Sequence, residues 1–230
     1  PLINDGKVVS YKSSEYAKDM GTPERYRRVQ EDYNSGICDA KNLANKQKAI
    51  FLDRDGTINE YVGFLRKEED FRLIPGVSEA IKKINNSGYL AIVVTNQPVI
   101  ARGEVTEEEL EEIHKKMETL LGLDGAYIDD IYYCPHHPDK GFEGEIPELK
   151  IECDCRKPKT GMLEKAAREH NIDLSSSIMI GDSTLDIKMA ENAGMQSVLL
   201  KTGQKGEDGK YDVSPTLIAE DLNDAINKII

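Results

Sequence analysis

The sequence lacks an excess of basic residues: its 30 Lys and Arg are outnumbered by 42 Asp and Glu, and the formal net charge is -12 at pH 7. Binding to a phosphate backbone or an anionic membrane draws on clustered Lys and Arg, so we expect no nucleic-acid partner. No apolar run approaches the roughly 18 residues of a membrane span, and no signal peptide is visible. We therefore expect no membrane association and a cytoplasmic location. The chain starts at Pro1 rather than Met, which is consistent with a piece of a longer protein.

Cysteine is also scarce, with four residues in the chain. Cys134, Cys153 and Cys155 lie close together in the sequence, and only Cys38 stands apart. In a reducing compartment such grouping is typical of metal binding rather than of disulfides.

A change of pattern near Gln47 predicts two parts. Residues 1–46 are polar with little periodicity, and we interpret them as an appendage and linker. In residues 47–230, short apolar runs alternate with segments of helical spacing. The expected strands cover residues 49–52, 90–94, 128–133, 178–180, 197–200 and 217–219, and the expected helices include residues 77–84, 106–120, 162–166, 184–193 and 222–230. This alternation predicts an α/β fold with a doubly wound, mostly parallel, Rossmann-like sheet.

Two carboxylates, Asp53 and Asp55, directly follow the apolar run at 49–52 in the segment Asp-Arg-Asp-Gly-Thr. In open α/β sheets ligands bind at the carboxyl ends of the strands. Two acids at that edge repel each other unless a cation or a reacting group offsets their charge. Taken alone, the segment is better explained as an Asp-Gly turn with a second, solvated Asp.

Three further polar segments each follow an expected strand or precede a helix: Thr95-Asn96-Gln97, Arg156-Lys157-Pro158 and Gly181-Asp182-Ser183. Each has a simpler interpretation, as a turn, a solvated cation or a capping box formed by Ser183 and Asp186. A parallel sheet brings strand ends to one edge, so we expect these segments to share one cleft with Asp53 and Asp55.

The residue types fit phosphoryl transfer. Asp53 is the candidate nucleophile that forms an aspartyl-phosphate, and Asp55 is the candidate acid and base. Thr95 and Lys157 would contact the transferring phosphoryl oxygens. We assign Asp53, Asp55 and Asp182 to a Mg²⁺ site. Its ligands would be carboxylate oxygens, a backbone carbonyl and water.

These segments resemble the four motifs of the haloacid-dehalogenase-type phosphatases. The resemblance rests on Asp53-x-Asp-Gly-Thr, Thr95, Lys157 and Gly181-Asp182-x3-Asp186, and it runs from about residue 48 to residue 230. It implies the fold of that family and phosphatase activity.

The cysteine segment predicts a zinc-binding loop insertion. Cys134, His136, Cys153 and Cys155 make a set of four ligands suited to tetrahedral Zn²⁺. Four protein ligands leave no open position, so we expect a structural ion that orders a long loop and places Arg156 and Lys157. Reduced cysteines without a metal are the alternative, and we interpret the adjacent His137 as a bystander.

The segments Cys-Pro-His-His-Pro and Cys-Asp-Cys-Arg-Lys-Pro closely resemble the D-glycero-D-manno-heptose 1,7-bisphosphate phosphatases, whose relatives are the histidinol-phosphate phosphatases. The resemblance implies substrate contacts from the residues Tyr61, Val62, Gly63, Phe64, Thr95, Asn96, Gln97, Pro98 and Arg156. The chain departs from the family in two places. The stretch between His136 and Cys153 is longer than usual, and Pro98 stands where a small polar residue is common.

The segment Asp19–Tyr26 resembles the tail of sugar-nucleotidyltransferases, although a capped surface helix is the alternative. The match implies a fused or associated nucleotidyltransferase and the α-anomeric bisphosphate as substrate.

We therefore expect a Mg²⁺-dependent phosphomonoesterase that removes the C7 phosphate of a small phosphorylated sugar, the heptose 1,7-bisphosphate, in nucleotide-activated heptose biosynthesis. A histidinol-phosphate phosphatase is one alternative. A non-catalytic phosphosugar-binding module of a fused nucleotidyltransferase is an alternative of another class.

Overall fold

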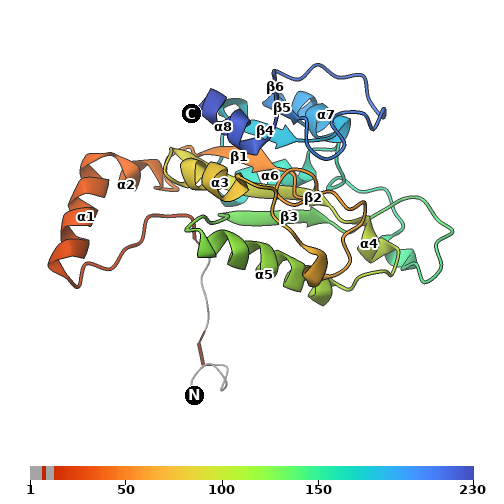
Figure 1. Ribbon diagram of the computed structural model, residues 1–230, viewed down its shortest axis with the longest axis horizontal. Helices are drawn as coiled ribbons and strands as arrows, with labels where there is room; N and C mark the ends of the chain where they lie inside the picture. The colour runs from red at the N-terminus through yellow and green to blue at the C-terminus, as the bar shows by residue number, and fades with distance from the viewer. Residues whose placement is uncertain (1–6, 9–12) are drawn as a thin grey trace.

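The computed structural model describes residues 7–8 and 13–230. In this part of the chain, six strands form one sheet in the order β3-β2-β1-β4-β5-β6, and every neighbouring pair is parallel (Figure 1). The strands are β1 (Lys48–Leu52), β2 (Tyr89–Asn96), β3 (Asp130–Cys134), β4 (Ile178–Gly181), β5 (Gln196–Leu200) and β6 (Leu217–Ala219). The expected doubly wound parallel sheet is confirmed.

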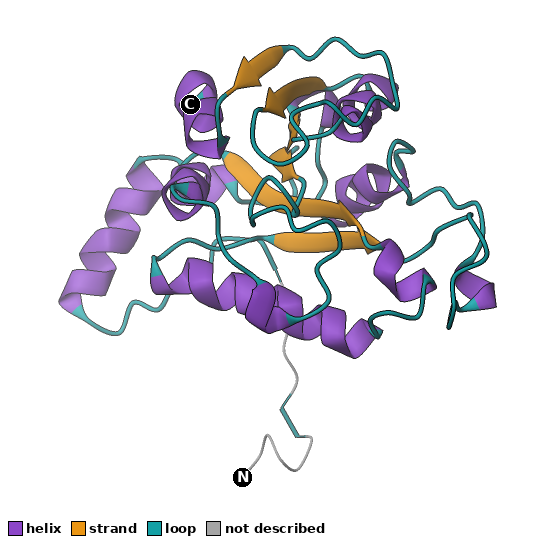
Figure 2. Ribbon diagram, turned by 45° about the vertical axis from the view of Figure 1, so that its right-hand side comes forward, coloured by secondary structure: helices purple, strands orange, loops and turns teal. Residues whose placement is uncertain are grey.

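Helices cover both faces of the sheet, which explains why its strands read as continuous apolar runs (Figure 2). One face packs against α3 (Val77–Asn85), α5 (Glu107–Leu123) and α8 (Leu222–Ile229). The other face packs against α6 (Gly161–Glu169) and α7 (Thr184–Ala193). The central strand β1 is buried from Ala49 to Leu52, so the residue after it starts from a rigid support.

Local signals set the ends of the helices. Thr106 and Glu109 form the expected capping box at the start of α5. Ser183 and Asp186 form another at the start of α7, and Gly194 ends that helix in the left-handed conformation. Short helices complete the described chain: α4 (Pro98–Ala101) and the 3-10 helices η1 (Glu68–Asp70), η2 (Pro147–Leu149) and η3 (Leu174–Ser176).

The described N-terminal residues contain two helices, α1 (Pro23–Asn34) and α2 (Ile37–Ala40), that extend away from the sheet (Figures 1 and 2). The capped surface helix considered for residues 19–26 is present as the start of α1, whereas α2 was not expected, and neither helix buries a side chain. Helix α1 is instead started by Thr22, whose hydroxyl accepts from Arg25 N. The expected appendage at 1–46 also includes residues 1–6 and 9–12, which lie outside the described residues.

A polar contact joins the described N-terminal residues to the α/β domain. Ser14 Oγ lies 3.2 Å from His170 Nδ1, and His170 Nε2 lies 2.8 Å from Asp130 Oδ2. The three residue types are those of a hydrolase triad, but Ser14 is only 8% exposed. The arrangement therefore anchors the segment rather than presenting a nucleophile.

The strand order reverses between β1 and β4, because β2 lies on one side of β1 while β4 lies on the other. Binding clefts of open α/β sheets form at this position, outside the carboxyl ends of the strands. Asp53 and Asp182 follow these two strands directly. No helix among the described residues is long and apolar enough to cross a membrane.

Candidate active site

A cleft of about 240 Å³ opens where the strand order reverses. Most of the predicted site residues line it: Asp53, Asp55, Tyr61, Gly63, Phe64, Thr95, Asn96, Gln97, Pro98, Arg156 and Lys157. Val62 is 53% exposed and does not line this cleft. Asp182 is buried beside it, with carboxylate oxygens near those of Asp53. The four segments predicted to converge do lie together.

A buried ion-pair network lies at the base of the cleft. Lys157 Nζ is 2.9 Å from Asp53 Oδ1 and 2.6 Å from Asp186 Oδ1, and it also donates to Val94 O. Burial raises the pKa of Asp53 to about 7, because the nearby charge of Lys157 only partly offsets the loss of solvent and the repulsion from Asp186. Burial and the charge of Asp53 likewise raise the pKa of Asp182 to about 8. The network therefore contains more carboxyl groups than its one lysine can neutralise, and the excess favours proton or cation binding.

Asp186 has two structural roles at once. Its Oδ2 accepts from Ser183 N and Ser183 Oγ, which completes the capping box of α7. Its Oδ1 accepts from Lys157 Nζ. Asp186 therefore caps α7 and also takes part in the site. Through this residue, the start of α7 fixes the orientation of Lys157.

Asp55 is held by three donors from different parts of the site. Its carboxylate accepts from Arg54 Nη2 at 2.8 Å, Asn59 Nδ2 at 3.0 Å and Gln97 Nε2 at 2.9 Å. Burial alone would raise the pKa of Asp55, but the Arg54 charge and the hydrogen bonds together hold it below its ordinary value. Gln97 also donates to Thr95 Oγ1, so Asp55 and Thr95 are aligned through one amide group.

The loop after β5 closes around Asp182. Gln204 N donates to Asp182 Oδ2, and Gly206 N donates to Asp182 O at 2.7 Å. Gly56 and Gly203 lie on either side with positive φ angles of 83° and 52°, and a Cβ at either position would overlap Asp182 Oδ2. The two glycines are therefore required for the close approach of both backbones to this carboxylate.

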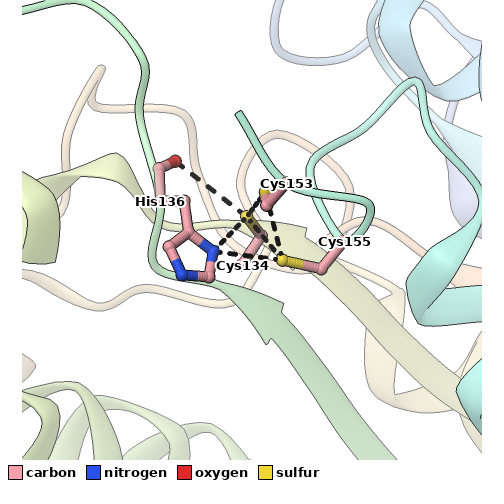
Figure 3. A group of neighbouring side chains, drawn as sticks. All are labelled: Cys134, His136, Cys153 and Cys155. Carbon is pink, nitrogen blue, oxygen red and sulfur yellow. Dashed lines mark hydrogen bonds between the residues drawn. The ribbon is translucent and has the colours of Figure 1, made fainter. Parts of the chain in front are cut away.

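The four predicted zinc ligands lie together (Figure 3). Their donor atoms all fall within 4.8 Å of one another, and the three Sγ···Sγ distances are 3.1, 3.3 and 3.5 Å. These distances are far longer than the roughly 2.05 Å of a disulfide. They approach the roughly 3.8 Å edge that Zn–S bonds of about 2.3 Å give in a tetrahedron. The chemistry and spacing of the four donors fit a zinc ion with four protein ligands in tetrahedral geometry and no open position.

The cysteine segment and the end of β2 together position Arg156 and Lys157. Arg156 Nη1 donates to His136 O at 3.1 Å, while Lys157 N donates to Asn96 Oδ1 at 3.0 Å and Asn96 Nδ2 donates back to Lys157 O. The loop at 137–152 also reaches the cleft, because Arg102 lies between the rings of Phe64 and Phe142 at 4.2 and 4.3 Å. The cysteine loop therefore forms one wall of the cleft.

Comparisons with known proteins agree with this geometry. A family model described as HAD-hydrolase-like matches residues 154–225. D-glycero-beta-D-manno-heptose-1,7-bisphosphate 7-phosphatase of Haemophilus ducreyi is 44% identical over 160 residues, which are 69% of this chain and 85% of that protein. This chain belongs to the heptose-bisphosphate phosphatase family of HAD-like hydrolases.

Further relatives support the family assignment. The D-glycero-alpha-D-manno-heptose-1,7-bisphosphate 7-phosphatase of Photorhabdus laumondii is also 44% identical, over 69% of this chain and 85% of that protein. A crystal structure of D,D-heptose 1,7-bisphosphate phosphatase from B. bronchiseptica, complexed with magnesium and phosphate, has a TM-score of 0.69 at 32% identity and covers 80% of this chain and 98% of that one. Relatives named for either anomer match equally well, so the expected α preference stays a prediction.

The sequence pattern missed several residues of the heptose-bisphosphate phosphatase cleft. The additional lining residues are Leu65, Arg102, His137, Leu185, Gln204 and Lys210. His137, interpreted as a bystander to zinc, is buried against the cleft, where its Nδ1 accepts from Asp139 N. Gln204 and Lys210 come from the glycine-rich loop after β5, whose composition gives no periodicity. The Thr202-Gly203 pair, one residue beyond the end of a buried strand, was the available signal.

We expect Gly203→Ala to destabilise this phosphatase by about 1–3 kcal/mol, because its Cβ would be forced against Asp182. Gly209→Ala is the matched control in the same loop: its φ is also positive, at 60°, but its Cβ would meet no atom closer than 4.0 Å. Urea unfolding of both variants isolates the steric effect. Equal losses of unfolding free energy would contradict the proposed clamp on Asp182.

Proposed function

We propose that this chain is a Mg²⁺-dependent phosphomonoesterase that hydrolyses the C7 phosphate of D-glycero-D-manno-heptose 1,7-bisphosphate through an aspartyl-phosphate. One observation carries the proposal: Asp53, Lys157 and Asp182 meet at the reversal of strand order in a chain 44% identical to a heptose-1,7-bisphosphate 7-phosphatase. This assembly matches the needs of phosphoryl transfer, which are positioning and the offset of negative charge.

Asp53 is the proposed nucleophile. Its Oδ1 is held by Lys157, and its carboxylate attacks phosphorus while the bond to the sugar oxygen breaks. Thr95 and Lys157 face the transferring phosphoryl oxygens, where negative charge resides. Water then attacks the aspartyl-phosphate, which releases inorganic phosphate and restores the Asp53 carboxylate.

Asp55 is the proposed acid and base. In the free protein its pKa lies below the ordinary value, so it is ionised at neutral pH. A phosphate dianion entering the cleft raises the pKa of an adjacent carboxyl, so substrate binding favours the protonated form. Asp55 gives this proton to the leaving sugar oxygen and later takes one from the attacking water.

The acidic cluster fits a magnesium ion. Asp53, Asp182 and Asp186 have carboxylate oxygens within 4.8 Å of one another, and Mg²⁺ prefers oxygen ligands of this kind. Asp186 is already committed to Lys157 and the start of α7, so we assign the ion to Asp53 and Asp182. Both side-chain oxygens of Asp55 accept hydrogen bonds, so it would contribute through its backbone carbonyl. When bound, Mg²⁺ offsets the charge of the carboxylates and of the phosphate.

The raised pKa values predict how magnesium binding depends on pH. With Asp53 titrating at about 7 and Asp182 at about 8, the metal-free folded protein holds more protons than the unfolded chain between roughly pH 4 and 8. Its free energy of unfolding therefore falls as pH rises through that window. Magnesium competes with those protons, so its stabilising effect is larger at pH 8 than at pH 5.5.

The check is thermal unfolding with and without Mg²⁺ at both pH values. At 100 times its Kd, Mg²⁺ adds about 2.7 kcal/mol, or about 5–10 °C in Tm for a chain of this size. A Tm increase that is equal at both pH values would contradict the assignment.

We also propose one structural Zn²⁺ per chain, bound by Cys134, His136, Cys153 and Cys155. Cys153→Ser is expected to reduce bound zinc to well below one ion per chain and to lower kcat, because Arg156, which donates to the backbone oxygen of His136, and the adjacent Lys157 lose a support. Cys38→Ser, which changes the cysteine outside the cluster, is the control. Elemental analysis of freshly purified protein checks both variants, and wild-type protein with little zinc would refute the site.

The charges of the cleft favour a bisphosphate over histidinol phosphate. Lys157 is committed to the acidic network, but Arg102, Arg156 and Lys210 also line the cleft. Arg102 Nε is buried and has no hydrogen-bond partner among the described residues. These cations would attract the second phosphate of a sugar bisphosphate and repel the amine of histidinol phosphate.

Phosphate release from the two substrates tests the proposed function. We expect a higher kcat/KM for the heptose bisphosphate, and Asp53→Asn is expected to lower kcat by at least about 1,000-fold while the protein stays folded. A preference for histidinol phosphate would overturn the substrate. Activity of Asp53→Asn at the wild-type rate would overturn the nucleophile, whereas an inactive wild-type protein would favour the non-catalytic binding module.

The wider proposal is a cytoplasmic enzyme of nucleotide-activated heptose biosynthesis that works with a fused or associated nucleotidyltransferase. It rests on the segment Asp19–Tyr26, which forms the exposed approach to α1 and its first turn. The domain division at residue 46 is likewise proposed, and the position of α1 and α2 away from the sheet supports it.

A further inference from the structure

A buried chain of contacts runs from helix α5 to the carboxylate of Asp55. The Arg54 side chain is 0% exposed, and its Nη2 lies 2.8 Å from Asp55 Oδ2 and 3.1 Å from Asp55 Oδ1. Its Nε lies 3.3 Å from Asp55 Oδ1. The other nitrogen, Nη1, lies 3.2 Å from Nε2 of His114, which is 7% exposed on α5.

The imidazole of His114 must accept this hydrogen bond, because a guanidinium has donors only. His114 is therefore neutral, with its proton on Nδ1. Burial and the charge of Arg54 lower the pKa of His114 to about 3, which agrees with that state. The Tyr133 ring packs against the imidazole at a centroid distance of 5.9 Å.

A neutral acceptor is the suitable partner at this position. An apolar side chain would leave a buried N–H of Arg54 unpaired, which is costly. A carboxylate would compete with Asp55 for the guanidinium charge. The imidazole satisfies Nη1 without adding charge, so the full charge and the planar fork of Arg54 remain directed at Asp55.

We propose that His114 is a positioning residue that fixes Asp55 through Arg54. Neither His114 nor Arg54 lines the cleft, so both act through Asp55 rather than on the substrate. The inference rests on the proposed function, in which Asp55 must transfer a proton at a fixed place. Small displacements of such a group lower the rate strongly while they change substrate binding little.

Steady-state kinetics with the zinc-loaded protein and Mg²⁺ test the proposal. His114→Leu, which removes the acceptor, is expected to lower kcat at least about 10-fold with KM changed less than about twofold. His114→Gln, whose amide oxygen can accept from Arg54, is expected to stay within about threefold of wild type. The result that overturns the proposal is a folded His114→Leu protein, judged by its Tm, with wild-type kcat.

A double-mutant cycle separates positioning from a general structural effect. If His114 acts through Asp55, adding His114→Leu to Asp55→Asn should lower the remaining kcat by less than about twofold. If the two losses multiply, the proposal is wrong. Should His114→Leu not fold, Arg54→Lys takes its place in the cycle, because it keeps a buried cation but removes the fork and the His114 contact.

Every variant is also measured with p-nitrophenyl phosphate as substrate. A wild-type protein that cleaves this ester but not the heptose bisphosphate would overturn the proposed substrate alone. The comparison of His114→Leu with His114→Gln on the ester would then still confirm or refute the role of His114.

Discussion

The buried pairing of Lys157 with Asp53 and Asp186 is the constraint on which the rest of the site depends. The Lys157 side chain is 2% exposed, and both carboxylates lie within 3 Å of its Nζ. Removing the lysine from such a group leaves buried carboxylates without a cationic partner, at a cost of about 3–5 kcal/mol. The surrounding structure is therefore organised to keep this lysine in place.

Three elements converge on Lys157 for that purpose. The end of β2 supplies Val94 O and the side-chain amide of Asn96, which pairs with the Lys157 backbone in both directions. Helix α7 supplies Asp186, already fixed by its own capping box. The cysteine cluster ends two residues before Lys157, so an ion bound there would hold the start of this segment against the core. The catalytic geometry thus depends on sheet, helix cap and loop together.

The sequence predicted the parts of this arrangement that follow from strand ends. Asp53, Thr95 and Asp182 directly follow or terminate buried strands, and a parallel sheet must bring such positions to one edge. Side-chain pairing could not be predicted in the same way. Arg54 had no predicted role, yet its side chain is fully buried against Asp55. Its other partner, His114, lies 60 residues away on α5, so spacing along the sequence does not reveal the pair.

Helices α1 and α2 and the loop after β5 give little signal in the sequence. Helices α1 and α2 bury no side chain, so no apolar stripe marks them in the sequence, and α1 is indicated only by the cap at Thr22 and by Pro23. The loop after β5 gives no periodicity, because backbone amides and glycines make its contacts with Asp182. Periodicity reveals packing faces, whereas these segments are held by capping and backbone hydrogen bonds.

Residues 137–152 form one wall of the cleft, and the contacts that hold this wall differ from the buried ion pairs at the base. Only His137 and Lys150 are buried within it, and Leu149 packs against the small apolar cluster that includes Val99 and Ile100, so little of the wall rests on apolar packing. Phe142 instead contacts both Arg102 and Lys150 through its ring, and Ile146 N donates to Ala101 O. These contacts hold the wall in place without involving Asp53, Lys157 or Asp182. A longer loop can therefore change the shape of this wall while the contacts of Asp53, Lys157 and Asp182 at the sheet edge stay unchanged.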